Sequence, residues 1–328
     1  MRLPPELTDF ESALAPNPSV PTELVCPTVY SLLIPETKAA TEELWAAAPH
    51  LLYERAFDGG QEELPALMLD TWRRWSGMTL GNAFPHEYVT AGASEAIKDL
   101  IVPGNRIHCF KGDYEGYRHI ALARGVPYFE HERQVIFGDE LLPGDQFFVT
   151  DPSSIDGEQW SDLDGWLEWM NEQLPEVRIV IDSVYVGAVH RYSPRNFERH
   201  PNVAAVILSL SKPFGIYYHR AGGVISRRVI PSLIGNKWFY NPFSIALATL
   251  LMRRYPVDEI PRRYAELQRR ALESAIRARE VPESAVPSNV FLLAKAAEGQ
   301  KEFRRTDRVY RFCLTPRMYE ELYPSARP

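Results

Sequence analysis

A chain of 328 residues, 45% hydrophobic and 24% charged, is long enough for a large and a small domain and too apolar for a disordered protein. The net charge of -7 and the dispersed arginines argue against a nucleic-acid partner. No run approaches the roughly 18 apolar residues of a membrane span, and the start lacks signal-peptide character, so we expect a cytoplasmic protein without a membrane partner. Three widely spaced cysteines predict neither disulfides nor a metal site.

The chain divides into three segments by pattern. Residues 1–50 are rich in proline, show a helical pattern only over 41–52, and are expected to form an N-terminal arm and part of a small domain. Residues 51–235 are expected to form a large domain, in which helices alternate with short runs rich in Val, Ile and Phe. Such runs predict buried parallel strands. They occupy residues 106–110, 146–150, 177–181, 204–210 and 222–226.

Two helices can be predicted in detail. Ser161 and Asp164 fit a capping box at the start of one helix, whose buried face is expected to contain several apolar residues. These residues are Leu163, Trp166, Leu167, Met170 and Leu174. A long amphipathic helix places Tyr264, Leu267, Ala271, Ala275 and Ile276 on one face. Residues 236–328 are expected to form the C-terminal part of the small domain, which gives an α/β fold overall.

The first candidate site lies in the sequence Thr90-Ala91-Gly92-Ala93-Ser94-Glu95, where an extended run meets a glycine and then a helix. Backbone N–H groups at such a helix start, with the Ser94 hydroxyl, form an anion site that the helix dipole favours. An ordinary strand-to-helix turn explains this pattern equally well.

The second and third candidate sites each follow an apolar strand. Asp182, three residues before Tyr185, is placed to keep a pyridinium nitrogen protonated, although a strand-end aspartate is more often a cap. Lys212 is placed to form a Schiff base and to act as a general base. Ser209 and Arg220 would then complete a phosphate site. A solvated loop lysine is the simpler alternative.

Arg311 is the fourth candidate, in the aromatic and apolar sequence Tyr310-Arg311-Phe312-Cys313-Leu314. Burying an arginine there is costly unless it has an anion as a partner. A substrate carboxylate and an internal acidic side chain are equally plausible partners on physical grounds.

In this order, the Asp-x-x-Tyr, Ser-x-x-Lys and Lys-to-Arg spacings resemble those of fold-type I aminotransferases that use pyridoxal 5′-phosphate. TAGASEAI also resembles the phosphate turn of that family. The chain is most similar in length and spacing to histidinol-phosphate aminotransferase and threonine-phosphate decarboxylase. The resemblance implies a mostly parallel sheet sandwiched by helices, with a small α+β domain formed by both termini.

The resemblance also implies a role for each matching residue. Lys212, Asp182 and Tyr185 would be catalytic, and Arg311 would bind the substrate carboxylate. The remaining residues would bind the cofactor together with these three: Gly92, Ala93, Ser94, Tyr114, Ser154, Ser209, Arg220 and, from the partner subunit of a homodimer, the residue equivalent to Tyr53. No metal is implied.

One stretch departs from the family pattern, which has an asparagine near the phenolic oxygen of the cofactor. Ser154 stands at that position in Asp151-Pro152-Ser153-Ser154-Ile155, and Ile155 replaces the following proline. A cis peptide bond before Ile155 is therefore not expected. The region between Lys212 and Arg311 is also short for the family, which suggests a specialised biosynthetic enzyme.

The resemblance thus implies a homodimeric aminotransferase that acts on an amino acid and a 2-oxo acid. A lyase, decarboxylase or cyclase with the same cofactor is the first alternative, because the bond that breaks depends on the orientation of the substrate. A fold that binds a ligand without catalysis is the second, and the lysine argues against it.

Overall fold

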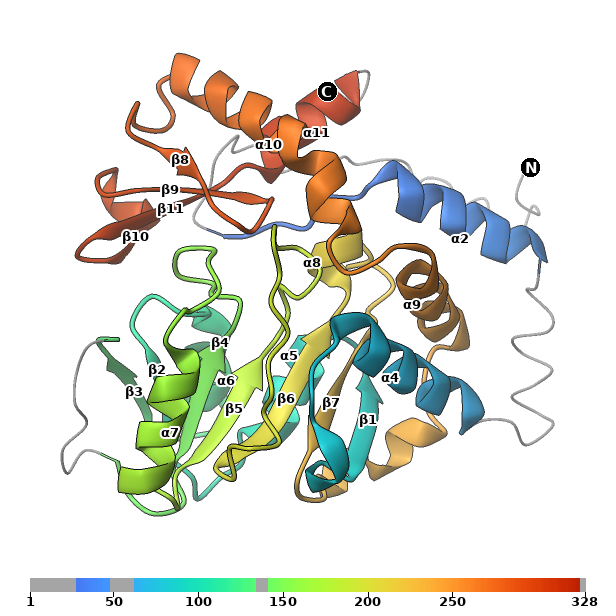
Figure 1. The fold of residues 1–328 in the computed structure, drawn as a ribbon, viewed down its shortest axis with the longest axis vertical. Coiled ribbons are helices and arrows are strands. Elements are labelled where there is room, and N and C mark those ends of the chain that lie inside the picture. Colours follow the sequence, from blue (N-terminus) through green and yellow to red (C-terminus); the bar gives the residue numbers. More distant parts are fainter. Residues whose placement is uncertain (1–27, 48–61, 134–140, 325–328) are drawn as a thin grey trace.

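A computed structural model describes residues 28–47, 62–133 and 141–324. A mixed seven-stranded sheet, in the order β1-β7-β6-β5-β4-β2-β3, forms the lower body in Figure 1. Its strands are β1 (His86–Thr90), β2 (Ile107–Phe110), β3 (Tyr128–His131), β4 (Gln146–Thr150), β5 (Arg178–Asp182), β6 (Val203–Ser209) and β7 (Gly222–Ser226). Each of the predicted runs forms a strand, and β3 was not predicted.

Most neighbouring strands in this sheet are parallel, as predicted, but β7 is not. It lies between β6 and β1 and runs antiparallel to both. The apolar pattern of residues 222–226 indicates burial on both faces but not direction, so the sequence prediction of a parallel strand was wrong here. The carboxyl ends of β4, β5 and β6 meet at one edge of the sheet.

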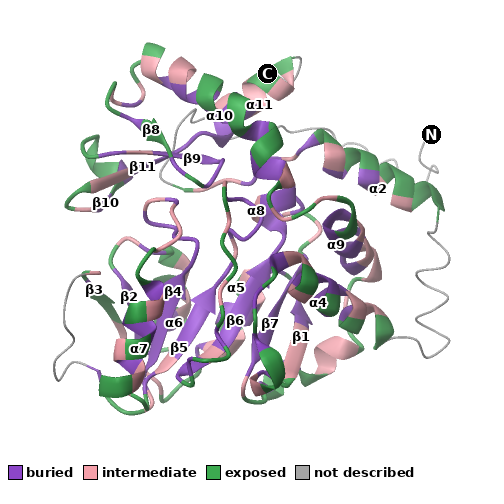
Figure 2. Cartoon of the chain, viewed as in Figure 1, coloured by how far each residue is buried: buried purple, intermediate pink, exposed green. Residues whose placement is uncertain are grey.

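Helices cover both faces of the sheet, as alternating strand residues require. Phe148, Val180 and Ile207 pack with residues of α5 (Ala93–Leu100) and α6 (Glu115–Ala123). Phe147 and Ile181 belong to the larger cluster on the other face, which includes residues of three helices. These are α4 (Glu63–Ser76), α7 (Leu163–Gln173) and α9 (Pro242–Arg254). Figure 2 shows the central strands of the sheet buried and the edge strands β1 and β3 more exposed.

A second sheet, in the order β10-β11-β9-β8, lies above the carboxyl edge of the first (Figure 1). Its strands are β8 (Val286–Pro287), β9 (Leu293–Ala296), β10 (Arg304–Thr306) and β11 (Val309–Cys313). Two helices accompany it, α10 (Glu259–Arg277) and α11 (Thr315–Leu322). The other short elements are α8 (Ser211–Phe214), η2 (Gly81–Ala83), η3 (Pro231–Lys237) and η4 (Lys301–Phe303).

Two helix starts differ from the sequence predictions. The N-terminal helix is α2 (Pro35–Ala47), which begins before residue 41 because a proline fits the first helical position. The capping box at α7 is wrong: Asp162 is the N-cap residue and makes no side-chain cap. Asp164 instead pairs with Arg199 and His200, so its carboxylate is used elsewhere. The predicted buried residues of α7 are otherwise buried, except that Leu174 follows the helix and is half-buried.

The long predicted helix forms as α10, with Tyr264, Leu267, Ala271 and Ala275 buried. α9 comes after the predicted boundary at residue 235 and packs against α4 of the large domain. The domain boundaries themselves stay a prediction. Within the described ranges, no helix is both long and apolar enough to cross a membrane.

Candidate active site

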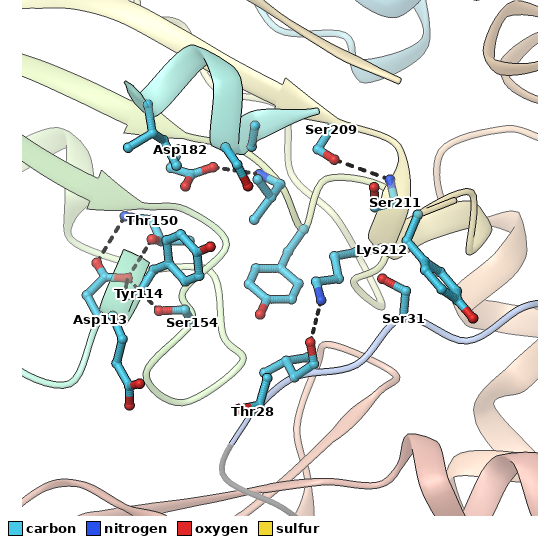
Figure 3. Close-up of a pocket in the computed structure, with 18 of the residues that line it drawn as sticks. Thr28, Ser31, Asp113, Tyr114, Thr150, Ser154, Asp182, Ser209, Ser211 and Lys212 are labelled. Atoms are coloured by element: carbon cyan, nitrogen blue, oxygen red, sulfur yellow. Dashed lines mark hydrogen bonds between the residues drawn. The ribbon is translucent and has the colours of Figure 1, made fainter. Parts of the chain in front are cut away.

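A cavity of about 290 Å³ lies where the carboxyl ends of the parallel strands meet the second sheet. This edge is the usual ligand site of an open α/β sheet. Figure 3 shows labelled side chains from the strand ends of the first sheet, from the loops that follow them and from the N-terminal segment around this cavity. Most predicted site residues line the cavity: Ala93, Ser94, Tyr114, Ser154, Asp182, Tyr185, Ser209, Lys212, Arg220 and Arg311.

Two predicted residues are not among the lining residues. Tyr53 lies outside the described residues, so its predicted role at a partner's site stays a prediction. Gly92 lies directly behind the cavity wall, with a φ of 79° that favours glycine. A Cβ atom there would lie 3.0 Å from a guanidinium nitrogen of Arg220. Glycine therefore allows Arg220 to approach the start of α5, as a shared anion site requires.

The residues after β6 place hydroxyl groups beside this arginine. Ser209 ends the strand, and its hydroxyl accepts a hydrogen bond from the Ser211 backbone N–H at 3.3 Å. Ser211 is 9% exposed, and its hydroxyl has no hydrogen-bond partner among the described residues. Sequence analysis did not single out Ser211, although it directly precedes Lys212. A buried hydroxyl without a partner costs about 1–3 kcal/mol, which fits a site built for an anion.

Lys212 sits in α8, a single helical turn, where its neighbours Ser211 and Pro213 are buried. Its Nζ donates a 2.5 Å hydrogen bond to the carbonyl oxygen of Val29. Thr28, Val29 and Ser31 line the cavity, so the N-terminal segment forms one of its walls. The N-terminal arm was predicted from the sequence, but its position beside the lysine was not. The amine of this half-buried residue thus lies at the cavity, next to the N-terminal segment (Figure 3).

Asp182 ends β5 and is 1% exposed. Its carboxylate accepts a hydrogen bond from the Tyr117 hydroxyl at 2.8 Å and one from the Val184 N–H at 3.3 Å. Burial, with a further contribution from the nearby Asp113 carboxylate, raises the pKa of Asp182 to about 7. A carboxyl group with this pKa is able to exchange a proton at neutral pH.

A second buried carboxylate, Asp113, lies in the same wall and was not predicted as a site residue. It follows β2 and accepts hydrogen bonds from the Thr150 hydroxyl at 2.5 Å and the Thr150 N–H at 3.2 Å. The Ser154 hydroxyl donates to it as well. An acidic residue after a buried strand, directly before the predicted Tyr114, was the signal in the sequence that could have identified it.

Ser154 therefore lines the cavity as predicted, but its hydroxyl is already used by Asp113. Its own carbonyl oxygen accepts a hydrogen bond from Arg311. Among the described residues the cis peptide bond lies earlier in this loop, at Asp151–Pro152. A role of Ser154 in cofactor binding stays a prediction.

Arg311, on β11, is 5% exposed and faces the cavity from the second sheet. Burial is the main cause that lowers the pKa of Arg311 to about 10, and the charge of the nearby Arg305 guanidinium contributes to it. Tyr185 also lines the cavity, and burial raises the pKa of its phenol. Tyr114 is 43% exposed at the cavity mouth, where an aromatic ring is free to stack on a ligand.

Comparisons with solved structures show that the chain shares its fold with aminotransferases and with a decarboxylase. It superposes on histidinol-phosphate aminotransferase from Sinorhizobium meliloti, solved with pyridoxal-5′-phosphate, with a TM-score of 0.64 and 12% identity over 92% of this chain and 89% of that one. An aminotransferase from Mycobacterium tuberculosis superposes with a TM-score of 0.62 and 19% identity, over 98% of this chain and 97% of that one. L-threonine-O-3-phosphate decarboxylase from Porphyromonas gingivalis superposes with a TM-score of 0.61 and 14% identity, over 90% of this chain and 98% of that one. No family model and no curated protein matches the sequence. The predicted fold-type I architecture is confirmed.

Proposed function

We propose that this protein is a pyridoxal-5′-phosphate-dependent aminotransferase acting on an amino acid and a 2-oxo acid. One observation carries the proposal: Lys212, Asp182 and the group formed by Ser94, Ser209 and Arg220 line the same cavity. An amine, a carboxylate and an anion site are the features that this cofactor requires of a protein. The fold shared with aminotransferases supports the same assignment.

The residues present fit the cofactor at the phosphate end. The Ser211 hydroxyl is buried without a described partner, and Gly92 leaves room for the Arg220 guanidinium beside the helix start. Hydroxyl groups, N–H groups and a guanidinium are the donors that bind phosphate. When bound, the cofactor would supply an electron sink for negative charge at the substrate Cα.

The chain's own residues would then position the substrate and move one proton. Lys212 Nζ, held at the cavity wall by the Val29 carbonyl, is placed to hold the cofactor and to act as the general base. Asp182 is placed to pair with the ring nitrogen, and Tyr185 and Tyr114 to contact the ring. Arg311 would bind the substrate carboxylate through its planar guanidinium.

The test combines labelling with product analysis. We expect the purified protein to be yellow, and borohydride reduction followed by peptide mapping to place the cofactor on Lys212. Incubation with a panel of amino acids is expected to yield pyridoxamine phosphate and the matching 2-oxo acid. A reduced adduct on another lysine, or a protein that binds no pyridoxal phosphate, would refute the assignment.

Decarboxylation is the second candidate, favoured by the similar TM-score of the Porphyromonas gingivalis decarboxylase. The same lysine, carboxylate and arginine serve either reaction, because the orientation of the substrate selects the bond that breaks. Mass spectrometry of the panel distinguishes the two: an amine and carbon dioxide mark decarboxylation, whereas a 2-oxo acid marks transamination.

A homodimer is part of the proposal. Three aromatic residues are strongly exposed: Trp45 is 60% exposed, Tyr218 68% and Phe239 80%. Trp45 packs edge-on against Phe243, which in turn contacts His219, next to Arg220. Aromatic side chains are enriched at protein interfaces, which supports a partner subunit on this surface. Light scattering that shows a fully active monomer would contradict the dimer. The cytoplasmic location stays a prediction.

A further inference from the structure

A continuous chain of hydrogen-bonding side chains joins the two buried carboxylates in the cavity wall. The Tyr117 hydroxyl lies 2.8 Å from Asp182 and 3.0 Å from the Thr150 hydroxyl. The Thr150 hydroxyl lies 2.5 Å from Asp113, which also receives the Ser154 hydroxyl. The order is therefore Asp182, Tyr117, Thr150, Asp113 and Ser154, part of which is visible in Figure 3.

The hydrogens available do not match these contacts if both carboxyl groups are ionised. Each hydroxyl has one hydrogen to donate, and an ionised carboxylate has none. Ser154 donates to Asp113, so Tyr117 and Thr150 must supply hydrogens to three contacts: with Asp182, with each other, and with Asp113. Two hydrogens cannot fill three contacts, and a proton on one of the two carboxyl groups would fill the third.

The surroundings of the chain also disfavour two negative charges. Asp113 is 7% exposed and Asp182 is 1% exposed. The charged or titratable groups near the pair include Cys109 of β2, Tyr117 of α6 and Tyr185 after β5. Two cationic side chains, Lys212 of α8 and Arg311 of β11, line the same cavity. Burial and the Asp113 charge both raise the pKa of Asp182, as expected when two carboxylates share one proton.

We propose that Asp113 is a positioning residue that shares a single proton with Asp182 through the hydroxyls of Tyr117 and Thr150. The proton moves by a concerted shift: Asp182 donates to Tyr117, Tyr117 to Thr150, and Thr150 to Asp113. No charge enters or leaves the wall in this step.

The shared proton gives Asp182 two defined states. With the proton on Asp182, that group is a neutral donor. With the proton on Asp113, Asp182 is an acceptor whose charge is stabilised by the Tyr117 hydroxyl, which is the state that a protonated ring nitrogen requires. Asp113 thus allows Asp182 to become ionised without releasing its proton to solvent. This role of Asp113 rests on the proposed function, whereas the sharing of one proton is argued from the hydrogen-bond contacts alone.

The test is an infrared pH titration of the cofactor-free protein. At about pH 6, free Asp and Glu side chains are ionised, so we expect the wild type to retain a carboxylic-acid C=O band that Asp182→Asn removes. The midpoint is the pH at which half of that band is lost. Asp113→Asn is expected to lower this midpoint by at least about one pH unit, because the Asn amide donates to Thr150 and no carboxyl proton is needed.

Two variants test the connection itself and do not depend on the folding of Asp113→Asn. Thr150→Val frees the Tyr117 hydroxyl to donate to Asp182 permanently and is expected to lower the midpoint. Tyr117→Phe removes that donor and is expected to raise it. Glu115→Gln is the matched control: it removes an exposed carboxylate that also lines the cavity, pairs with Arg305 and lies outside the chain, so the midpoint stays unchanged.

The inference is overturned if the wild type shows no such band, or if Asp113→Asn, Thr150→Val and Tyr117→Phe all keep the wild-type midpoint. Measuring pyridoxal-phosphate binding in the same samples separates this inference from the proposed function. A protein that binds no cofactor but shows the titration refutes only the proposed function. A protein that binds the cofactor on Lys212 with no shared proton refutes only the role of Asp113.

Discussion

The two sides of the cavity differ in how their polar groups are satisfied. On the side we call the carboxylate wall (Asp113, Tyr117, Thr150, Ser154 and Asp182), every side chain has a hydrogen-bond partner within the protein. On the side we call the anion wall (Gly92, Ser94, Ser209, Ser211 and Arg220), the buried Ser211 hydroxyl has none among the described residues. One wall is organised by its own contacts, whereas the other, under the proposed function, would be completed by a ligand.

This difference has an energetic meaning. An internally satisfied network is rigid and orders its side chains before a ligand arrives. A buried hydroxyl without a partner costs stability, which proteins tolerate at sites where a ligand provides the missing contact. We therefore expect substitutions in the anion wall to change ligand affinity, and substitutions in the carboxylate wall to change protonation.

Lys212, between the two walls, is expected to show the largest effect. Lys212→Ala removes both the attachment group and the general base, so turnover is expected to fall by at least about 10³-fold. Thermal unfolding is expected to change less than turnover, because the Lys212 amine is only partly buried and its hydrogen bond is to the carbonyl oxygen of Val29 in the cavity wall. Lys111→Ala, at an exposed lysine paired with Glu132, is the control for loss of a lysine. Full activity in Lys212→Ala would exclude the assignment.

Arg311→Lys is expected to raise the KM for the amino acid by about 10- to 100-fold and to leave cofactor retention unchanged. Lysine keeps the charge but loses the fork that binds a carboxylate through two hydrogen bonds. Arg304→Lys, on the neighbouring strand and paired with Asp307, controls for arginine replacement in the second sheet. If Arg311→Lys instead releases the cofactor, Arg311 is part of the anion wall.

Ser211→Ala is expected to weaken binding of pyridoxal 5′-phosphate by about tenfold but not that of pyridoxal, because only the first carries the anion. Equilibrium dialysis with both compounds measures the ratio. Ser244→Ala is a closely matched control, since Ser244 is also buried with a hydroxyl that has no partner among the described residues but lies on α9. An equal loss for both compounds would show that Ser211 does not contact the phosphate.

The carboxylate wall is expected to make stability depend on pH. Because the folded-state pKa of Asp182 is about 7 and its ordinary value is 3.8, the folded protein binds the proton more tightly than the unfolded chain. Protonation of Asp182 therefore contributes to the free energy of unfolding. This contribution is fully present below about pH 4 and is lost as the pH rises through 7, by on the order of a few kcal/mol. Melting temperatures of the cofactor-free protein measure this loss, and Asp182→Asn is expected to reduce it. An identical pH profile in that variant would contradict the raised pKa.

Several features of this protein were accessible from local sequence. The apolar runs marked the strands, and the polar residues directly after them marked the cavity edge, because the carboxyl ends of neighbouring parallel strands meet there. Asp182, Ser209 and Lys212 were found in this way. Gly92 was found because a glycine between a strand and a helix indicates a turn that few other residues can adopt.

Other features depended on contacts between segments far apart in the chain. The direction of β7 is set by its pairing with β1 and β6 and is not specified by its own residues. The contact of Lys212 with Val29 spans 183 positions, and that of Asp113 with Ser154 spans 41. The sequence by itself determined which residue types stand at the strand ends. Only the tertiary structure decided that Asp113 and Asp182 share one network, because burial and hydrogen-bond partners come from packing and not from local sequence.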